Sequence, residues 1–209
     1  MNKRIKICGL SSLQQINTAA THGAFWYGLV FYSKSPRYIP IKKARELIKG
    51  SPKDIVPVSI TVDAKLSEIK KISELGIKTF QLHGDENLNY CKEIKKLFSA
   101  TIIKSIGVRE EKDLFHANYY INDVDWIIFD YKSNEMQGGS GKSFNWQFLK
   151  DKKLNFKWIL SGGLDYNNVA EAINTTQAKA LDVSSGVENF EGEKSIELIK
   201  KFCDNVKKC

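Results

Sequence analysis

Eight short apolar runs recur along this 209-residue sequence, and an amphipathic stretch rich in lysine and glutamate follows each of them. The runs are rich in the β-branched and aromatic residues that favour strands. They lie at 4–8, 26–31, 55–62, 78–82, 101–106, 125–130, 157–162 and 179–185. A chain with this alternation is expected to build a parallel sheet covered by helices.

The stretches between the runs are predicted to be helices. The clearest lies at 66–75, where apolar residues recur at steps of three and four and Gly76 follows as a C-terminal cap. Two more are predicted at 90–98 and 195–206. Eight alternations without a change in composition predict an α/β fold, a single (β/α)8 TIM barrel over residues 1–209. An open doubly wound sheet is the alternative, but it usually has fewer strands, and no Gly-x-Gly-x-x-Gly motif follows the first run.

The composition is that of an ordinary globular protein, with 42% hydrophobic and 27% charged residues. No window approaches the ~18 consecutive apolar residues of a membrane span. The basic N-terminus lacks the apolar run of a secretory signal, so we expect a cytoplasmic protein with no membrane partner. Cys8, Cys91, Cys203 and Cys209 lack Cys-x-x-Cys spacing and are predicted to be free thiols. The three histidines form no cluster with each other or with cysteines, so no metal site is predicted.

The formal net charge of +8 arises from lysines that are spread over many predicted helices. A nucleic-acid binder more often concentrates its basic residues in one stripe, so a solvated surface is the favoured interpretation and no nucleic-acid partner is predicted. Steering of an anionic small substrate and a nucleic-acid face remain as alternatives. No exposed apolar stripe is evident, and the chain is predicted to be a monomer.

Polar and reactive side chains follow the predicted strands at their C-terminal ends. In (β/α)8 barrels this end carries the chemistry, whereas the opposite end contributes stability. The residues concerned are Cys8, Arg37, His83, Asp130, Ser161, Gly162, Gly163, Asp182, Ser184, Ser185 and Gly186. They are therefore expected to converge on one rim of the barrel.

Two glycine-containing turns, 161–163 and 184–186, follow the last two strands. Glycine leaves backbone N–H groups able to point at an anion. Phosphate sites in such barrels are frequently built from the loops after strands seven and eight. The expected phosphate-binding residues are Gly162, Gly163, Ser184, Ser185 and Gly186. The alternative is a pair of turns that merely join elements.

Two rim residues could move protons. Asp130 closes an apolar strand, and partial burial would raise the pKa of its carboxyl and suit it to donate a proton; the alternative is a capping or ion-paired aspartate. Cys8 could act as a thiolate base if a neighbouring cation or dipole lowered its pKa. The alternative for Cys8 is a small buried apolar residue. Arg37 follows a rigid proline and could grip a carboxylate bidentately, or lie on the surface, and His83 could line the pocket.

Seven segments, in order along the chain, are similar to those of the phosphoribosylanthranilate isomerase family of tryptophan biosynthesis. They are KICGL (6–10), FYSKSPR (31–37), QLHG (81–84), FD (129–130), GGSGKSFNW (138–146), SGGL (161–164) and LDVSSGVE (181–188). KICGL and DVSSGVE together are highly specific. The chain departs from the family pattern at 58–61, at 23–25 and at Lys194-Ser195, where serine can still cap the last helix.

The resemblance implies an Amadori rearrangement without metal or organic cofactor. N-(5-phosphoribosyl)anthranilate would become 1-(o-carboxyphenylamino)-1-deoxyribulose 5-phosphate, with Asp130 as the general acid and Cys8 as the general base. Arg37 would hold the anthranilate carboxylate, the glycine turns the phosphate, and His83 and Asp182 would also contact the substrate. Such a site must raise the pKa of Asp130 and lower that of Cys8.

Lys6 is assigned no part in this activation, because side-chain alternation along the strand is expected to turn it away from its neighbours.

Other phosphosugar barrels would share the phosphate turns. An indole-glycerol-phosphate synthase relative lacks a cysteine in this context, and an aminoaldose isomerase of histidine biosynthesis would be expected to have an aspartate in place of Cys8. A non-catalytic phosphate- or RNA-binding barrel is the alternative of another class, and it would tolerate the loss of Cys8.

Overall fold

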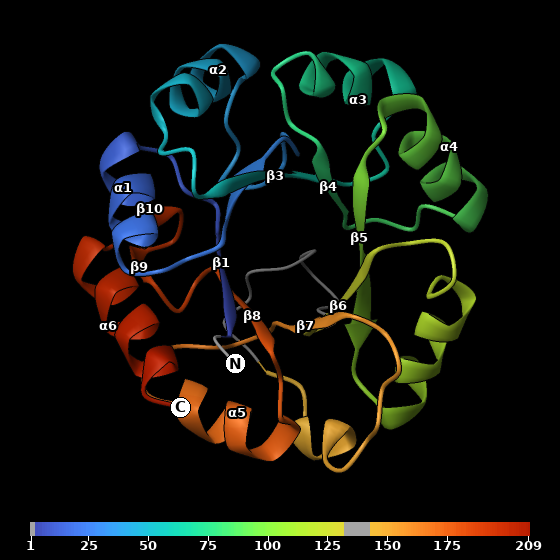
Figure 1. Ribbon diagram of the computed structural model, residues 1–209, viewed down its shortest axis with the longest axis vertical. Helices are drawn as coiled ribbons and strands as arrows, with labels where there is room; N and C mark the ends of the chain where they lie inside the picture. The colour runs from blue at the N-terminus through green and yellow to red at the C-terminus, as the bar shows by residue number, and fades with distance from the viewer. Residues whose placement is uncertain (1–2, 132–142) are drawn as a thin grey trace.

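The computed structural model describes residues 3–131 and 143–209, and its strands form a closed ring (Figure 1). Neighbouring strands are parallel, and β1 pairs with both β2 and β8, which closes the barrel. The strands are β1 (Arg4–Cys8), β2 (Trp26–Val30), β3 (Val56–Thr61), β4 (Thr79–Leu82), β5 (Thr101–Val108), β6 (Trp126–Tyr131), β7 (Trp158–Leu160) and β8 (Ala180–Val183). The predicted (β/α)8 barrel is confirmed; the seventh and eighth strands are shorter than expected.

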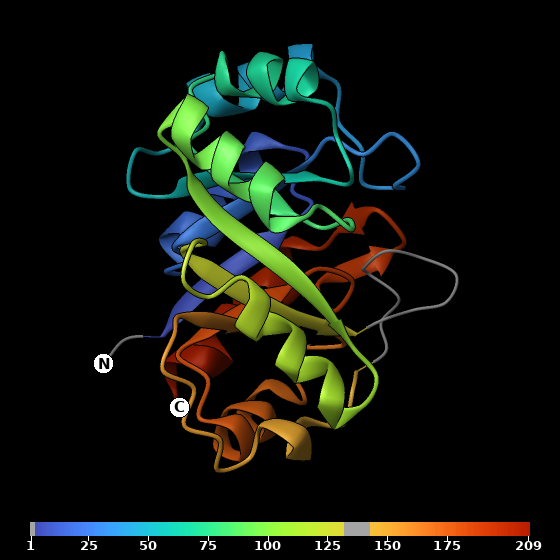
Figure 2. The same ribbon diagram turned by 90° about the vertical axis from the view of Figure 1, so that its right-hand side faces the viewer.

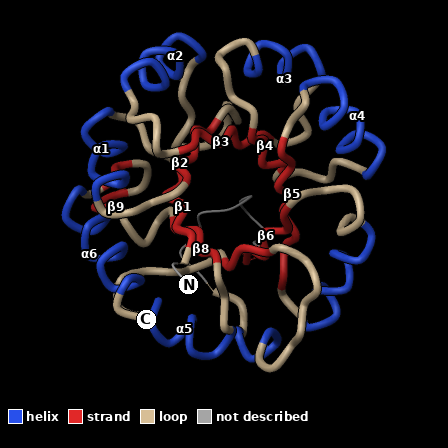
Figure 3. The backbone as a smooth tube through the Cα atoms, viewed as in Figure 1, coloured by secondary structure: helices blue, strands red, loops and turns tan. Residues whose placement is uncertain are grey.

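Helices form an outer layer around the strands, as Figure 3 shows. They are α1 (Leu13–Thr21), α2 (Ile41–Gly50), α3 (Leu66–Ser73), α4 (Leu88–Phe98), α5 (Val169–Thr176) and α6 (Ile196–Lys207). The 3₁₀ helices η1 (Glu111–Tyr119) and η2 (Trp146–Leu149) stand where α-helices were predicted after β5 and β6. In η1, aspartate, histidine and asparagine interrupt the strong helix formers, which favours short irregular turns.

The predicted helix ends depend on identifiable caps. The helix predicted over 66–75 ends earlier, because α3 stops at Ser73 and its C-cap is Glu74 rather than Gly76. Gly76 lies just beyond, with φ of +89°, a conformation that glycine adopts without strain. Ser195 caps α6 as expected, because its hydroxyl accepts a hydrogen bond of 3.4 Å from the backbone N–H of Leu198. Residues 132–142, which include part of the GGSGKSFNW segment, lie outside the described residues.

A short antiparallel hairpin between β8 and α6 was not predicted. It consists of β9 (Glu188–Phe190) and β10 (Glu193–Lys194). Figure 2 shows it projecting at the right, on the side of the barrel opposite the N-terminus. The hairpin therefore adds two charged side chains, Glu188 and Lys194, near the C-terminal rim.

The barrel interior is layered. An apolar cluster, consisting of Trp26, Val58, Ile103, Ile128, Ile159 and Ala180, fills its N-terminal half. Lys6, Gln81, Asp130 and Asp182 are buried polar residues from strands of the same ring. Because the N-terminal half is packed with apolar side chains, reactive groups can gather only toward the C-terminal rim. Within the described residues, no helix is both long and apolar enough to span a membrane.

Candidate active site

Cys8 is the last residue of β1, and the backbone around it is shaped by two glycines. Gly9 has φ of +79°, so the chain turns directly after the thiol, and a Cβ there would lie 3.0 Å from Cδ of Arg37. Gly28 pairs with Cys8 in the β1–β2 register. A Cβ on Gly28 would lie 3.0 Å from the Cys8 Sγ and 2.8 Å from Cδ1 of Ile60. The two glycines thus provide the space that the thiol and the arginine occupy.

Asp130 lies in β6 and is 8% exposed. Its Oδ1 accepts a hydrogen bond of 2.8 Å from the backbone N–H of Tyr131, and its Oδ2 lies 3.6 Å from Nε2 of His83. Burial, followed by the negative charge of Asp182, raises the pKa of Asp130 to about 7. The carboxyl is therefore partly protonated at neutral pH, as the sequence predicted for a proton donor.

His83 is a neutral partner of this carboxyl. Burial and the positive charges of Lys104 and Lys6 lower the pKa of His83 to about 3. Its Nδ1 lies 2.9 Å from Nε2 of Gln81. With the Gln81 amide donating to Nδ1, the ring proton resides on Nε2, which faces Asp130. His83 therefore contributes a hydrogen-bond donor rather than a charge.

Lys6 belongs to this cluster, although the sequence analysis assigned it no part in activating the thiol. Residues two apart in a strand share a face, so Lys6 and Cys8 both enter the barrel. Lys6 is fully buried, and its Nζ donates a hydrogen bond of 2.8 Å to Oδ1 of Asp182. The Ser161 hydroxyl donates to Oδ2 of the same carboxylate at 3.2 Å. Two predicted strand-end residues, Ser161 and Asp182, are thus hydrogen-bonded to each other, and Asp182 also binds a lysine that sequence reasoning set aside.

The direction of the Cys8 pKa also differs from expectation. Burial raises the pKa of the Cys8 thiol; Lys6 and Lys194 oppose this rise, and Asp182 adds to it. The thiol is therefore protonated at neutral pH, whereas the sequence predicted a lowered pKa. The physical reason is desolvation, which disfavours a thiolate inside the ring by more than the neighbouring cations favour it.

Arg37, in the loop after β2, is buried and paired with Glu188 of the hairpin. Its Nε and Nη2 donate to the two carboxylate oxygens of Glu188, each at 2.7 Å. This bidentate contact takes one edge of the guanidinium. The edge formed by Nη1 and Nη2 carries a second pair of parallel donors that suits another carboxylate.

Lys194 links the arginine to the loop after β8. Its Nζ donates to Glu188, to the carbonyl oxygen of Ser184 at 2.9 Å and to the Ser184 hydroxyl at 3.2 Å. Burial alone would raise the pKa of Glu188, but hydrogen bonds from Arg37 and Lys194 hold it below its usual range. The carboxylate is therefore charged and binds both cations. Glu188 belongs to the DVSSGVE segment of the sequence. Its partners, Arg37 after β2 and Lys194 in β10, are brought to it only by folding.

The two glycine turns lie side by side. Gly162 and Gly163 have φ of +86° and +66°. A Cβ on Gly186 would lie 1.9 Å from the carbonyl oxygen of Leu164, so only glycine fits there. A bridge between Asp165 and Gly186 joins the turns. Ser184, in the second turn, donates its hydroxyl to the Cys8 carbonyl at 3.4 Å. The turns therefore flank the end of β1.

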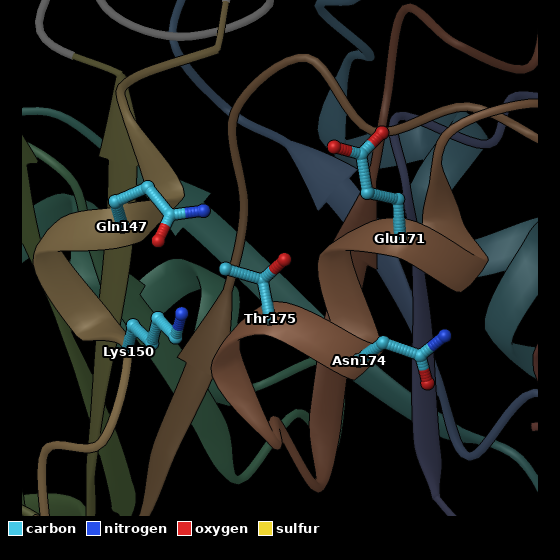
Figure 4. A pocket seen from close by; sticks show the side chains of 5 residues that line it. All are labelled: Gln147, Lys150, Glu171, Asn174 and Thr175. Atoms are coloured by element: carbon cyan, nitrogen blue, oxygen red, sulfur yellow. The ribbon is translucent and has the colours of Figure 1, made fainter.

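A hollow on the outer surface lies away from these residues. Figure 4 shows Gln147 and Lys150 facing Glu171, Asn174 and Thr175 of α5 across it. Since none of the predicted site residues lines this hollow, it is not the candidate active site. No group of three or more potential metal ligands occurs in the part of the chain that the structure describes.

Known proteins resemble the chain over its whole length. A model of the N-(5'phosphoribosyl)anthranilate (PRA) isomerase family matches residues 5–205. An N-(5'-phosphoribosyl)anthranilate isomerase of Bacillus cereus is 40% identical over 98% of this chain and 99% of its own. That of Zymomonas mobilis is 36% identical over 99% of both chains.

Solved structures agree with the sequence relatives. The phosphoribosyl anthranilate isomerase of Thermotoga maritima has a TM-score of 0.90 at 34% identity, with 100% of both chains covered. A phosphoribosyl anthranilate isomerase in complex with reduced 1-(o-carboxyphenylamino)-1-deoxyribulose 5-phosphate has a TM-score of 0.87 at 33% identity, again covering both chains completely. Because the family model matches nearly every residue and the relatives are similar over their whole length, the chain belongs to the N-(5'-phosphoribosyl)anthranilate isomerase family.

Proposed function

We propose that this chain catalyses the Amadori rearrangement of N-(5-phosphoribosyl)anthranilate to 1-(o-carboxyphenylamino)-1-deoxyribulose 5-phosphate, a step of tryptophan biosynthesis. Membership of the isomerase family supports the reaction. The observation that carries the assignment of residues is that Cys8 and Asp130 face the same buried pair, Lys6 and Asp182. An acid and a base that share these neighbours can act on adjacent atoms of one sugar.

Asp130 is the proposed general acid. A protonated carboxyl gives its proton to the ribose ring oxygen, the C1′–O bond breaks, and the nitrogen lone pair forms the C1′=N bond of a Schiff base. The pKa of about 7 supports this role, because a substantial fraction of the carboxyl keeps its proton at neutral pH. The neutral His83 beside Oδ2 helps to keep Asp130 oriented toward the interior.

Cys8 is the proposed general base. Its thiolate removes the proton from C2′, and the electron pair of the C2′–H bond forms the C1′=C2′ double bond as the C=N electrons return to nitrogen. The product is an enolamine, which tautomerises to the ketone. Because burial raises the pKa of Cys8, the reacting form is the minor one in which Cys8 is ionised while Asp130 is protonated.

The two anionic ends of the substrate are proposed to bind on either side of these groups. The phosphate binds the turns that contain Gly162, Gly163, Ser184, Ser185 and Gly186, where adjacent glycine turns offer backbone N–H donors. The carboxylate binds the second donor edge of Arg37. Holding both ends fixes the ribose between acid and base, which is catalysis by positioning.

Asp182 and His83 have supporting parts in the proposal. Each carboxylate oxygen of Asp182 already accepts one hydrogen bond, from Lys6 or from Ser161. A carboxylate oxygen can accept a second one, and in the proposal Asp182 accepts it from a sugar hydroxyl. No metal or organic cofactor is part of the proposed chemistry, since proton transfers alone balance the rearrangement.

Complementation of a bacterial tryptophan auxotroph that lacks this isomerase tests the reaction. Growth without tryptophan is expected for the natural chain, and absence of growth from a well-expressed, folded chain refutes the proposal. With purified protein, Cys8→Ser and Asp130→Asn are each expected to lower kcat by at least ~10², with KM little changed. Arg37→Ala is expected to raise KM instead. Near-normal turnover of Cys8→Ser would rule out the base assignment.

The proposal also includes the assembly state and the cellular location of the protein. The sequence predicts a monomer in the cytoplasm, but a Thermotoga maritima relative is described as dimeric. Sedimentation at the concentration used for the assay distinguishes the monomer from the dimer.

A further inference from the structure

We propose that the buried Lys6–Asp182 ion pair is an oriented pair of positioning residues: its ammonium end stabilises the Cys8 thiolate, and its carboxylate end keeps the proton on Asp130. The inference rests on the proposed function and adds two residues that act through the acid and the base. It also identifies the two charges that increase the share of enzyme in which Cys8 is ionised while Asp130 is protonated.

The positions of five residues around the ring give the pair its direction. Asp130 is on β6, Ser161 directly follows β7, Asp182 is on β8, and Lys6 and Cys8 are on β1. These four strands are consecutive in the closed barrel. In the register of β1 and β8, Lys6 stands opposite Asp182. The pair therefore joins β1, which carries the base, to β8, which is separated from the strand of the acid, β6, by β7 alone.

Hydrogen bonds hold the pair in this direction. Asp182 Oδ1 accepts from Lys6 at 2.8 Å, and Oδ2 accepts from the Ser161 hydroxyl at 3.2 Å, on the side toward β6. Lys6 is fully buried, with its ammonium on the face of β1 that also carries Cys8. An ammonium has three donor hydrogens, and the bond to Asp182 uses one, so it can also donate toward a sulfur.

Stability does not account for such a pair. Replacing a buried ion pair by well-packed apolar residues is often neutral or stabilising, because the charges must be desolvated. Lys104 and Lys194 are also buried lysines of ion pairs, and Lys104 shows the contacts of a structural role. Its Nζ donates to three carbonyl oxygens, those of Leu82, Gly84 and Ser105, and to Glu86, which ties loops to the outside of the barrel.

The effects of Lys6 and Asp182 on the pKa values of Cys8 and Asp130 agree with this direction of the pair. At Cys8 the favourable effect of Lys6 exceeds the unfavourable effect of Asp182. At Asp130 the order is reversed, because Asp182 raises its pKa by more than Lys6 lowers it. Burial has the largest effect on both groups, and of the two charges of the pair Lys6 has the larger effect on Cys8 and Asp182 the larger effect on Asp130.

The remaining charges near the cluster are shared with other partners. Lys194 from β10 and Arg37 from the loop after β2 also face Cys8, but both bind the carboxylate of Glu188. His83, which faces Lys6 and Asp130, is uncharged. Lys6 and Asp182 are thus the charged pair that links the two reacting groups directly.

The test replaces both charges together, in the variant Lys6→Met/Asp182→Asn, so that no unpaired charge is buried. Without substrate, the pKa of Cys8 is measured from the ultraviolet absorbance of the thiolate, as a difference against the same protein with Cys8→Ala. The pKa of Asp130 is measured by carbon NMR of labelled aspartate, with Asp130→Asn for assignment. We expect the Cys8 pKa to rise and the Asp130 pKa to fall, each by ~1 unit or more.

The matched control is Lys104→Met/Glu86→Gln, which removes another buried ion pair. It is expected to leave the titration of Cys8 unchanged and to shift that of Asp130 by less than the variant at Lys6 and Asp182 does, because Lys104 acts on Asp130 through His83. If the double variant at Lys6 and Asp182 is poorly folded, Asp182→Asn alone serves, and it should lower both pKa values. Unchanged titration of Cys8 and Asp130 in the folded variant overturns the inference.

Turnover separates this inference from the proposed function. If the two pKa values move apart by ~1 unit each, the fraction of enzyme in the reacting protonation state falls ~10², and kcat/KM falls equally. Shifted pKa values with unchanged kcat/KM would support the electrostatic role of the pair and refute the assignment of Cys8 and Asp130 as base and acid. Rescue of the Cys8 pKa by Lys6→Arg, paired with the natural Asp182, would support the role of the charge.

Discussion

Raising the pH through 7 is predicted to increase kcat/KM, although it deprotonates the proposed acid. Asp130 titrates at about 7, and burial raises the pKa of Cys8 above the ordinary range of a thiol. The first proton therefore leaves mainly from Asp130, which gives an inactive form. A minor form with the same number of protons has Cys8 ionised and Asp130 protonated, and it is populated in constant proportion to the major one.

The pKa of Cys8 is raised above that of an ordinary thiol, whereas Asp130 titrates at about 7, so the reacting form is a minor fraction of the enzyme. The profile of kcat/KM against pH should rise with a midpoint near 7, reach a plateau, and fall above the pKa of Cys8. Steady-state kinetics over this range, with substrate well below KM, give the profile.

Asp130→Asn is the control, because it retains any ionisation of the substrate phosphate. Its residual activity should lack the limb near 7 and rise instead through the pKa of Cys8, since only the thiolate is then required. A natural enzyme whose kcat/KM falls through 7, with a rising limb at lower pH, would show that the thiol is already ionised in the acid range. That result would refute the protonation scheme.

Three further predictions concern single side chains. Asp130→Asn should stabilise the protein at pH 8. The pKa of Asp130 is raised from 3.8 to about 7 in the folded state, so its contribution to stability is fully present below about pH 4 and is lost, by ~4 kcal/mol, as the pH rises from there to 7. Urea unfolding at pH 8 and at pH 4 checks this, and a smaller gain at pH 8 than at pH 4 would contradict it. Gly28→Ala should lower kcat with little change in KM and cost ~1–3 kcal/mol, because its Cβ would meet Sγ of Cys8 at 3.0 Å; kinetics and thermal unfolding measure both, and normal turnover would argue against a tightly placed thiol. Glu188→Gln should cost ~3–5 kcal/mol in urea unfolding at pH 7, because two buried cations lose their shared carboxylate; a change under ~1 kcal/mol would show that these ion pairs contribute little.

The local hydrophobic pattern of the sequence was sufficient to predict the strands and most of the polar residues at the C-terminal rim. The β-branched runs identified all eight strands, because a strand buried on both faces is apolar along its length. Cys8 and Asp130 were predicted as site residues for a related reason: each is a polar residue at the end of such a run. The hairpin of β9 and β10 was missed, since each of its strands has at most three residues and carries no apolar alternation.

The sequence by itself determined the barrel, its order of elements and the residues at the C-terminal ends of its strands, because these depend on short-range periodicity. Closure of the ring decided the rest. Lys6 meets Asp182, and Arg37 meets Glu188, across 176 and 151 residues of chain. Closure also removed water from Cys8 and so raised its pKa, although Lys6 and Lys194 oppose that rise. Desolvation and ion pairing depend on what the whole fold packs around a group, and no local stretch of sequence specifies that surrounding.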